Sequence, residues 1–182
     1  MAVAATVYNF DIDLADADRS VYETLALRVA RHPSESDEYL LARVIAYCLE
    51  YREGIAFSPG GLSDPDQPPL AIRDLTGVLT AWIDIGTPDA SRLHRAAKAV
   101  ARVVVYVHKD PAQWLRSLAG VRIHRADALE VWGLDRTFVA ALCARLERRV
   151  AFTLSVSDRD LYASFVDATV SGRLTRLAVP CQ

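Results

Sequence analysis

The sequence predicts an α/β fold, with one mixed central sheet, flanking helices and a β-rich C-terminal extension. Three observations lead to this prediction. Residues 78–85 are apolar almost throughout, which is typical of a buried strand. Apolar residues recur with helical spacing before and after that run, at 34–51 and 89–98. Beyond residue 149 short apolar runs alternate with turns. The 182 residues, 52% of them apolar, are sufficient for a single domain over 1–182.

The first elements follow from the same patterns. Residues 4–14 alternate between apolar and polar, which predicts a half-buried strand. Asp16 and Asp18 are suited to the start of a helix, which we expect to continue to about Ala30. Pro33 ends that segment, and Ser34 is placed to begin a second helix that runs to about Tyr51.

The remaining elements are expected in a regular order after a long loop at 52–69. We expect strands near 55–57 and 70–73, a turn at 74–77, the central strand at 78–85, a helix over 89–98 and a strand over 103–107. A short helix near Trp114, a strand at 129–131, a helix from Asp135, and strands at 150–156, 161–165 and 173–179 complete the chain.

Composition excludes several classes of protein. A formal charge of −2 gives no long-range attraction for nucleic acid or anionic membranes, so any nucleic-acid site has to be a local basic patch. Cysteine spacing offers no zinc site, the first residues lack the basic start and apolar run typical of a signal peptide, and no apolar run has bilayer length. We therefore expect a cytoplasmic protein without a membrane partner, monomeric by default.

Asp84 is the most informative residue of the chain. It lies near the end of the apolar central strand, just before Gly86. An unpaired carboxylate is costly in such surroundings, so we expect it to be paired, hydrogen-bonded or bound to a metal.

The segment from Arg31 to Glu35 (RHPSE) and the segment from Trp82 to Asp89 (WIDIGTPD) together resemble the YaeQ family over the whole chain. That resemblance implies a variation of the PD-(D/E)XK nuclease-like fold, whose core runs helix, three strands, helix, strand. The elements expected over about 34–107 match this order, with 108–182 as the C-terminal helix and strands. The resemblance also implies that carboxylates hold Mg²⁺ (or Mn²⁺). The metal ion would polarise a phosphate and activate water.

Asp84 matches the second acid of the nuclease pattern, while Gly86 replaces its lysine. The missing cation could come from the following helix, which offers Arg92, Arg95 and Lys98, with Arg95 as the first choice and Lys98 next.

The first acid is Asp74, or Asp66 from the loop, or it is lost at Leu70. Glu38 or Glu35 on the second helix could supply a further metal ligand.

Each of these residues also has a structural interpretation. Asp84 could cap the next helix or pair with Arg92 or Arg95. Asp74 suits the first position of a type I turn, and Glu38 suits a solvated helix face.

Two functions are therefore carried forward. The first is a divalent-metal-dependent nuclease acting on nucleic acid, with Asp74 and Asp84 on the metal, Glu38 assisting, and Arg95 or Lys98 on phosphate. The second is a catalytically degenerate nuclease-fold protein that binds nucleic acid or a protein partner. A cation near a metal-bound water would favour the enzyme, whereas a direct ion pair between Asp84 and an arginine would favour the binding protein.

Overall fold

A computed structural model describes residues 5–58 and 66–180. Its strands are β1 (Thr6–Asp16), β2 (Val21–Arg31), β3 (Ile55–Phe57), β4 (Leu70–Arg73), β5 (Leu79–Ile85), β6 (Arg102–Val107), β7 (Glu130–Leu134), β8 (Arg149–Ser157), β9 (Asp160–Ser164) and β10 (Thr169–Leu177). Its α-helices are α1 (Asp37–Leu49), α2 (Ala90–Ala99), α3 (Ala112–Leu118) and α4 (Arg136–Cys143), with one 3₁₀ turn at Ala126–Ala128.

The described strands form one mixed sheet of ten strands in the order β2-β1-β8-β9-β10-β7-β6-β5-β4-β3. Pairs β1–β8, β5–β6 and β6–β7 are parallel and the other pairs are antiparallel. The predicted α/β class and mixed sheet are confirmed. The C-terminal strands are not an appendage, because β8 pairs with the N-terminal strand β1 and β10 pairs with β7 in the middle of the sheet.

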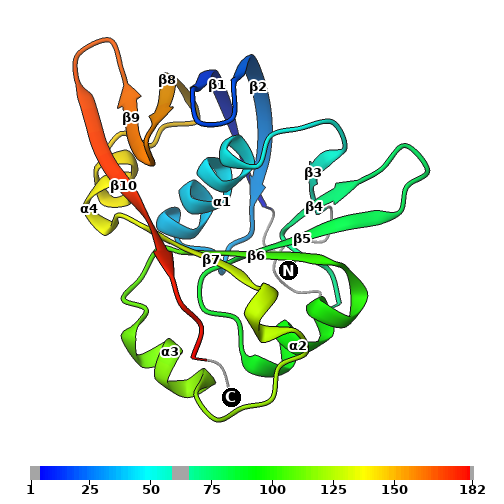
Figure 1. The fold of residues 1–182 in the computed structure, drawn as a ribbon. Coiled ribbons are helices and arrows are strands. Elements are labelled where there is room, and N and C mark those ends of the chain that lie inside the picture. The colour runs from blue at the N-terminus through cyan, green and yellow to red at the C-terminus, as the bar shows by residue number, and fades with distance from the viewer. Residues whose placement is uncertain (1–4, 59–65, 181–182) are drawn as a thin grey trace.

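The larger core forms where the sheet curves around α1 (Figure 1). Leu40, Val44 and Ile45 of α1 are fully buried against residues from both halves of the sheet, including Phe10 of β1 and Ile83 of β5. Ser36 rather than Ser34 caps this helix, because the Ser36 side chain accepts a hydrogen bond from the Tyr39 amide. A smaller core lies on the opposite face of β5–β7, under α2 and α3.

The helix expected from Asp16 to Ala30 is wrong, because this segment is the strand β2, which pairs with β1 along its whole length. Leu25 and Val29 are buried, and their spacing of four residues fits a helix and a strand equally well. Asp16 ends β1 and Asp18 lies in the β1–β2 turn, and the Asp16 side chain accepts hydrogen bonds from the backbone amide and side chain of Arg19. The pairing with β1 decides the conformation, and this is not visible in the local pattern.

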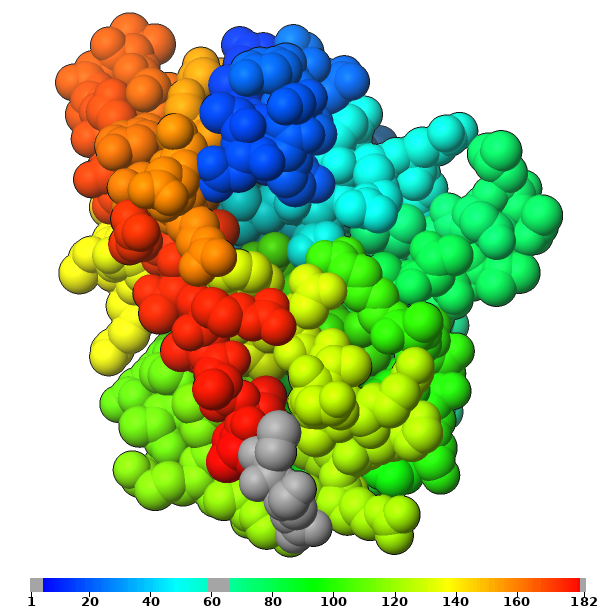
Figure 2. All heavy atoms as spheres, in the orientation of Figure 1, coloured from blue at the N-terminus to red at the C-terminus, as the bar shows by residue number. Residues whose placement is uncertain are grey.

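The rest of the expected element order is observed, including helix, three strands, helix and strand from α1 to β6. The β4–β5 hairpin projects from the body, with Leu75 and Val78 exposed near its tip (Figures 1 and 2). Within the described ranges no helix combines the length and apolar character needed to cross a membrane.

Candidate functional site

Asp84 lies one residue before the end of β5 and is 2% exposed. Alternation along the strand places it on the same face as Trp82, which belongs to the smaller core under α2. Ile83 and Ile85 face α1 on the other side of the sheet. The Asp84 carboxylate therefore meets the first turn of α2, the helix that begins after the β5–α2 connection.

Asp84 forms a bidentate ion pair with Arg92. Arg92 Nε lies 3.0 Å from both carboxylate oxygens, and its second terminal nitrogen is 2.8 Å from Oδ1. The indole nitrogen of Trp82 donates a further hydrogen bond of 2.9 Å to Oδ2. Both oxygens of the buried carboxylate are thus satisfied by side chains that the sequence places two and eight residues away.

Arg92 is held in this position from several sides. Asp89 caps α2 and accepts a 2.7 Å hydrogen bond from the Arg92 amide, which fixes the first turn of the helix. The guanidinium lies 5.3 Å from the centre of the Trp82 ring and also donates to the carbonyl oxygen of Gln67. Burial opposes the positive charge, but the hydrogen bonds and charge of Asp84 outweigh it and raise the pKa of Arg92.

The ion pair lines a cavity of about 240 Å³ together with Tyr39, Gln67, Pro69, Ile85, Thr87 and Pro88. Among the described residues of this lining, Asp84 is the one carboxylate. A Mg²⁺ ion needs several free oxygen ligands, and both Asp84 oxygens already accept hydrogen bonds. Among the residues that the structure describes, no three His, Cys, Asp or Glu side chains are grouped to hold a metal ion. The residues present therefore do not fit the expected metal.

Comparison with known proteins identifies the family. The profile of the family described as YaeQ protein matches residues 1–173. This chain belongs to the YaeQ family.

Relatives in the YaeQ family share both sequence and structure with this chain. Proteins described as uncharacterized protein YaeQ are 29% identical in Escherichia coli (90% of this chain, 91% of the relative) and in Salmonella typhi (99% of each). The crystal structure of YaeQ protein from Xanthomonas axonopodis pv. citri has a TM-score of 0.83 at 30% identity, over 97% of this chain and 99% of that one. The crystal structure of YaeQ protein from Pseudomonas syringae has a TM-score of 0.84 at 26% sequence identity, over 95% of this chain and 96% of that one.

In this YaeQ chain, Asp74 lies far from Asp84. The β4–β5 register places Leu70 opposite Ile83, whereas the Asp74 backbone bonds to Val78 at the other end of the hairpin. Six residues of strand, roughly 20 Å at about 3.3 Å per residue, separate Val78 from Asp84. Asp74 and Asp84, which we expected on one metal ion, therefore do not lie together.

Asp74 is instead a turn residue. Its side chain accepts hydrogen bonds from the Thr76 hydroxyl and amide and from the Val78 amide. The Thr76 hydroxyl and these amides lower the pKa of the exposed Asp74 carboxyl. Asp74 therefore has the turn role that its place before Gly77 suggested as the alternative to metal binding.

The other candidate residues also lie outside the Asp84 cavity. Arg95 is on the exposed face of α2, where it forms a 3.6 Å ion pair with the exposed Asp66, and Lys98 is exposed in the last turn. Glu38 is an exposed residue at the start of α1, where its own amide and Ser36 lower the pKa of the carboxyl. Glu35 is buried and pairs with Arg43 at 3.1 Å. The structure brings none of these side chains to Asp84.

Gly86 has a positive φ of 89°, and a Cβ placed there would lie 3.7 Å from the His108 ring. His108 is 6% exposed, and neither ring nitrogen has a hydrogen-bond partner within the described chain. Burial and the nearby Lys109 lower the pKa of His108 to about 4. Gly86 thus lies next to a buried neutral histidine.

Sequence reasoning missed a second group of polar residues on the α1 side of the sheet. Arg102 forms ion pairs with Glu50 at 2.7 Å and with Glu130 at 2.8 Å, and Tyr106 donates to Glu50 at 2.9 Å. These partners are 28 to 56 residues apart in the chain. The one sequence signal was Arg102 at the start of an otherwise apolar strand, because a charge there needs a partner.

Proposed function

We propose that this YaeQ protein is a catalytically degenerate member of the PD-(D/E)XK nuclease-like class, which binds nucleic acid without cutting it. The element order from α1 to β6 and the place of Asp84 near the end of β5 support the nuclease-like assignment. Fold analogy alone does not establish an activity, so the function has to be argued from the site.

The single observation that carries the proposal is the bidentate Asp84–Arg92 ion pair. Metal-assisted hydrolysis needs a carboxylate whose oxygens are free to coordinate the ion. Here the guanidinium contacts both oxygens at 3.0 Å, and Trp82 donates to one of them. Freeing the carboxylate for a metal would break the ion pair and leave the buried Asp84 charge with Trp82 as its remaining donor, which is strongly unfavourable.

Nucleic acid is the partner that the residues around this site favour. Arg95 and Lys98 are exposed on one face of α2, three residues apart, next to the helix turn that holds Arg92. The ion pair between Arg95 and Asp66 is 3.6 Å long, with side chains 51% and 77% exposed, so it competes weakly with a phosphate. With a net charge of −2, binding depends on this local pair of cations and is sensitive to salt.

The binding test is fluorescence anisotropy with labelled single-stranded DNA, double-stranded DNA and RNA at several salt concentrations. Arg95→Gln and Lys98→Gln should each weaken binding and reduce the salt slope by about one. Arg28→Gln, an exposed arginine on β2, is the matched control and should leave binding unchanged. If no oligonucleotide binds, nucleic acid is not the partner and a protein partner has to be sought.

The cleavage test is titration calorimetry with Mg²⁺ and Mn²⁺ on wild type and Asp84→Asn, followed by incubation with the same oligonucleotides. We expect no metal-binding heat that depends on Asp84 and no cleavage. Metal binding by wild type that is lost in Asp84→Asn, together with cleavage, would overturn the proposal and establish the nuclease.

A further inference from the structure

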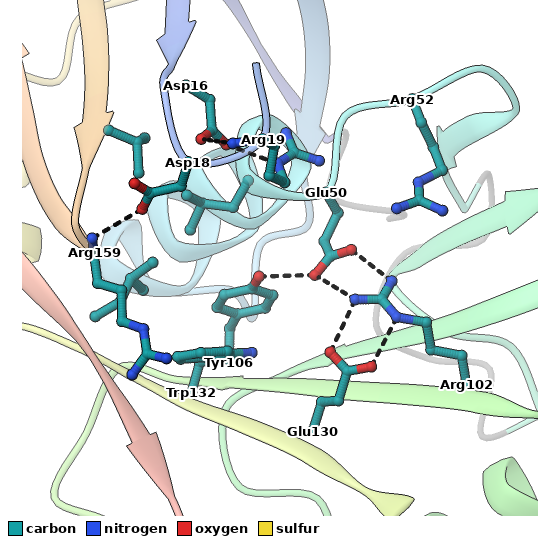
Figure 3. Close-up of a pocket in the computed structure, with 13 residues that line it drawn as sticks. Asp16, Asp18, Arg19, Glu50, Arg52, Arg102, Tyr106, Glu130, Trp132 and Arg159 are labelled. Atoms are coloured by element: carbon teal, nitrogen blue, oxygen red, sulfur yellow. Dashed lines mark hydrogen bonds and ion pairs between the residues drawn. The ribbon is translucent and has the colours of Figure 1, made fainter. Parts of the chain in front are cut away.

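A second cavity, of about 230 Å³, lies at the C-terminal end of α1, and we call it the α1 cavity (Figure 3). Its wall comes from the β1–β2 turn, the end of α1, β6, β7, the β8–β9 turn and β10. It is on the α1 side of the sheet, because Tyr106 of its wall belongs to the larger core, whereas Asp84 faces α2. The two cavities are therefore separate sites.

The carboxylates of the α1 cavity are all occupied. Both oxygens of Asp16 accept from Arg19, and both oxygens of Asp18 accept from backbone amides at 158 and 159. Glu50 and Glu130 accept from Arg102, and Glu50 also from Tyr106. Because every carboxylate oxygen already has a donor, the cavity is not built to bind a cation.

Two arginines of the wall are not paired with these carboxylates. Within the described chain, the guanidinium groups of Arg52 and Arg159 have no ion pair or hydrogen bond to a carboxylate. Figure 3 shows them on opposite sides of the cavity. By contrast, Arg19 donates to Asp16 and to carbonyl oxygens at the end of α1, and Arg102 joins two glutamates.

Arg159 is the better placed of the two. Its guanidinium lies over the Trp132 ring, 5.2 Å from the ring centre, and its N–H groups have no ion pair or hydrogen bond to a carboxylate within the described chain. An arginine guanidinium can donate two parallel hydrogen bonds to a carboxylate or phosphate. Apolar groups of Leu49, Val156 and Leu174 complete the wall.

We propose that the α1 cavity binds a small organic acid, a carboxylate or a phosphate ester with a short apolar body. The acid group is held by the N–H edge of Arg159, the apolar body lies against the aliphatic wall, and Arg52 attracts the anion from the other side. A volume somewhat below the roughly 300–1,000 Å³ of drug-sized pockets limits the ligand to a small molecule. The proposal does not depend on the Asp84 site or on nucleic-acid binding.

Tryptophan fluorescence gives a direct test, because Trp132 is half-buried in the cavity wall while Trp82 and Trp114 are buried elsewhere. The probes are benzoate, phenyl phosphate and the neutral analogue benzamide, with saturation-transfer NMR on the probes as an independent measurement. We expect saturable binding of at least one anion, roughly 10- to 100-fold tighter than benzamide. The two anions distinguish a carboxylate from a phosphate ester as the natural ligand.

The structure offers a closely matched control. Arg159 and Arg176 both stack on Trp132, at 5.2 and 5.1 Å, but Arg176 does not line the cavity. Arg159→Gln should weaken the anion roughly 10- to 100-fold and leave benzamide unchanged, whereas Arg176→Gln should leave both unchanged. Arg52→Gln should cause a smaller loss that disappears at high salt.

Three results would overturn the proposal. The first is that neither anion binds by fluorescence or NMR up to its solubility limit. The second is equal affinity for the anions and benzamide. The third is an equal loss of anion affinity in Arg159→Gln and Arg176→Gln, which would show that the surroundings of the Trp132 ring, rather than the Arg159 charge in the cavity, determine binding. Trp132→Phe should abolish the fluorescence change but keep the NMR signal.

Discussion

Replacing Arg92 by methionine tests how strongly the Asp84–Arg92 ion pair holds the carboxylate. Methionine keeps much of the aliphatic length but leaves the Asp84 carboxylate buried with the single Trp82 donor. Removing one partner of a buried ion pair costs about 3–5 kcal/mol. The Asp84 side chain is 3% exposed but that of Arg92 is 19% exposed, so we expect the lower end, about 3 kcal/mol. For a chain of this length the melting temperature should fall by roughly 6–12 °C.

The assay is urea unfolding followed by circular dichroism, with calorimetry for the melting temperature. Arg95→Met is the matched control on the same helix, because its ion pair is exposed and 3.6 Å long, and it should change stability by less than about 0.5 kcal/mol. The double variant Asp84→Asn with Arg92→Met should recover part of the loss, because no buried charge remains. A loss below about 1 kcal/mol in Arg92→Met would place the pair among ordinary surface ion pairs and refute the reasoning.

Two further predictions concern pH and backbone strain. Because burial lowers the pKa of His108 to about 4, the unfolded chain takes up a proton near pH 6.5 while the folded chain stays neutral, so stability should fall as pH drops from about 6.5 to 4. In urea titrations across this range His108→Gln should remove up to about 3 kcal/mol of this stability loss, whereas substitution of the exposed His32 by Gln should leave the loss in place. Gly54 and Gly77 share a φ of 85°, but a Cβ at Gly54 would lie 1.9 Å from the Arg73 oxygen and one at Gly77 meets nothing within 4 Å. Gly77→Ala should therefore cost about 1–2 kcal/mol in the same unfolding assay and Gly54→Ala clearly more, and equal losses would contradict the steric argument.

Local signals predicted most elements because each depends on nearby residues. Asp89 and Asp135 cap α2 and α4, and the apolar run at 103–107 is the buried strand β6. In these cases the capping residue and the apolar periodicity indicate the same element, and the tertiary contacts favour that element too. The strand β2 was missed because its apolar spacing fits two periods and the pairing partner decides between them.

The α1 cavity could not be predicted from the sequence. Arg102 reaches Glu50 across 52 residues and Glu130 across 28 residues, and the β8–β9 turn that carries Arg159 comes from the far end of the chain. No spacing rule links such positions, because the curvature of the sheet and the β1–β8 pairing bring them together. Charged residues with ordinary local surroundings can therefore form a site that only the tertiary structure reveals.

The choice between Arg92 and Arg95, by contrast, could have been made from helix geometry. Asp89 ends the connection from β5 and begins α2, so Arg92 lies in the first turn, closest to the end of the strand. Arg95 is three residues further along, about 4.5 Å at 1.5 Å per residue, and its side chain points to solvent. A cation in the first turn reaches the strand carboxylate directly and neutralises it, whereas a cation one turn later would leave it free for a metal. The position of the arginine within α2 thus decides whether the Asp84 carboxylate is paired or free to bind a metal. Here Arg92 pairs with it.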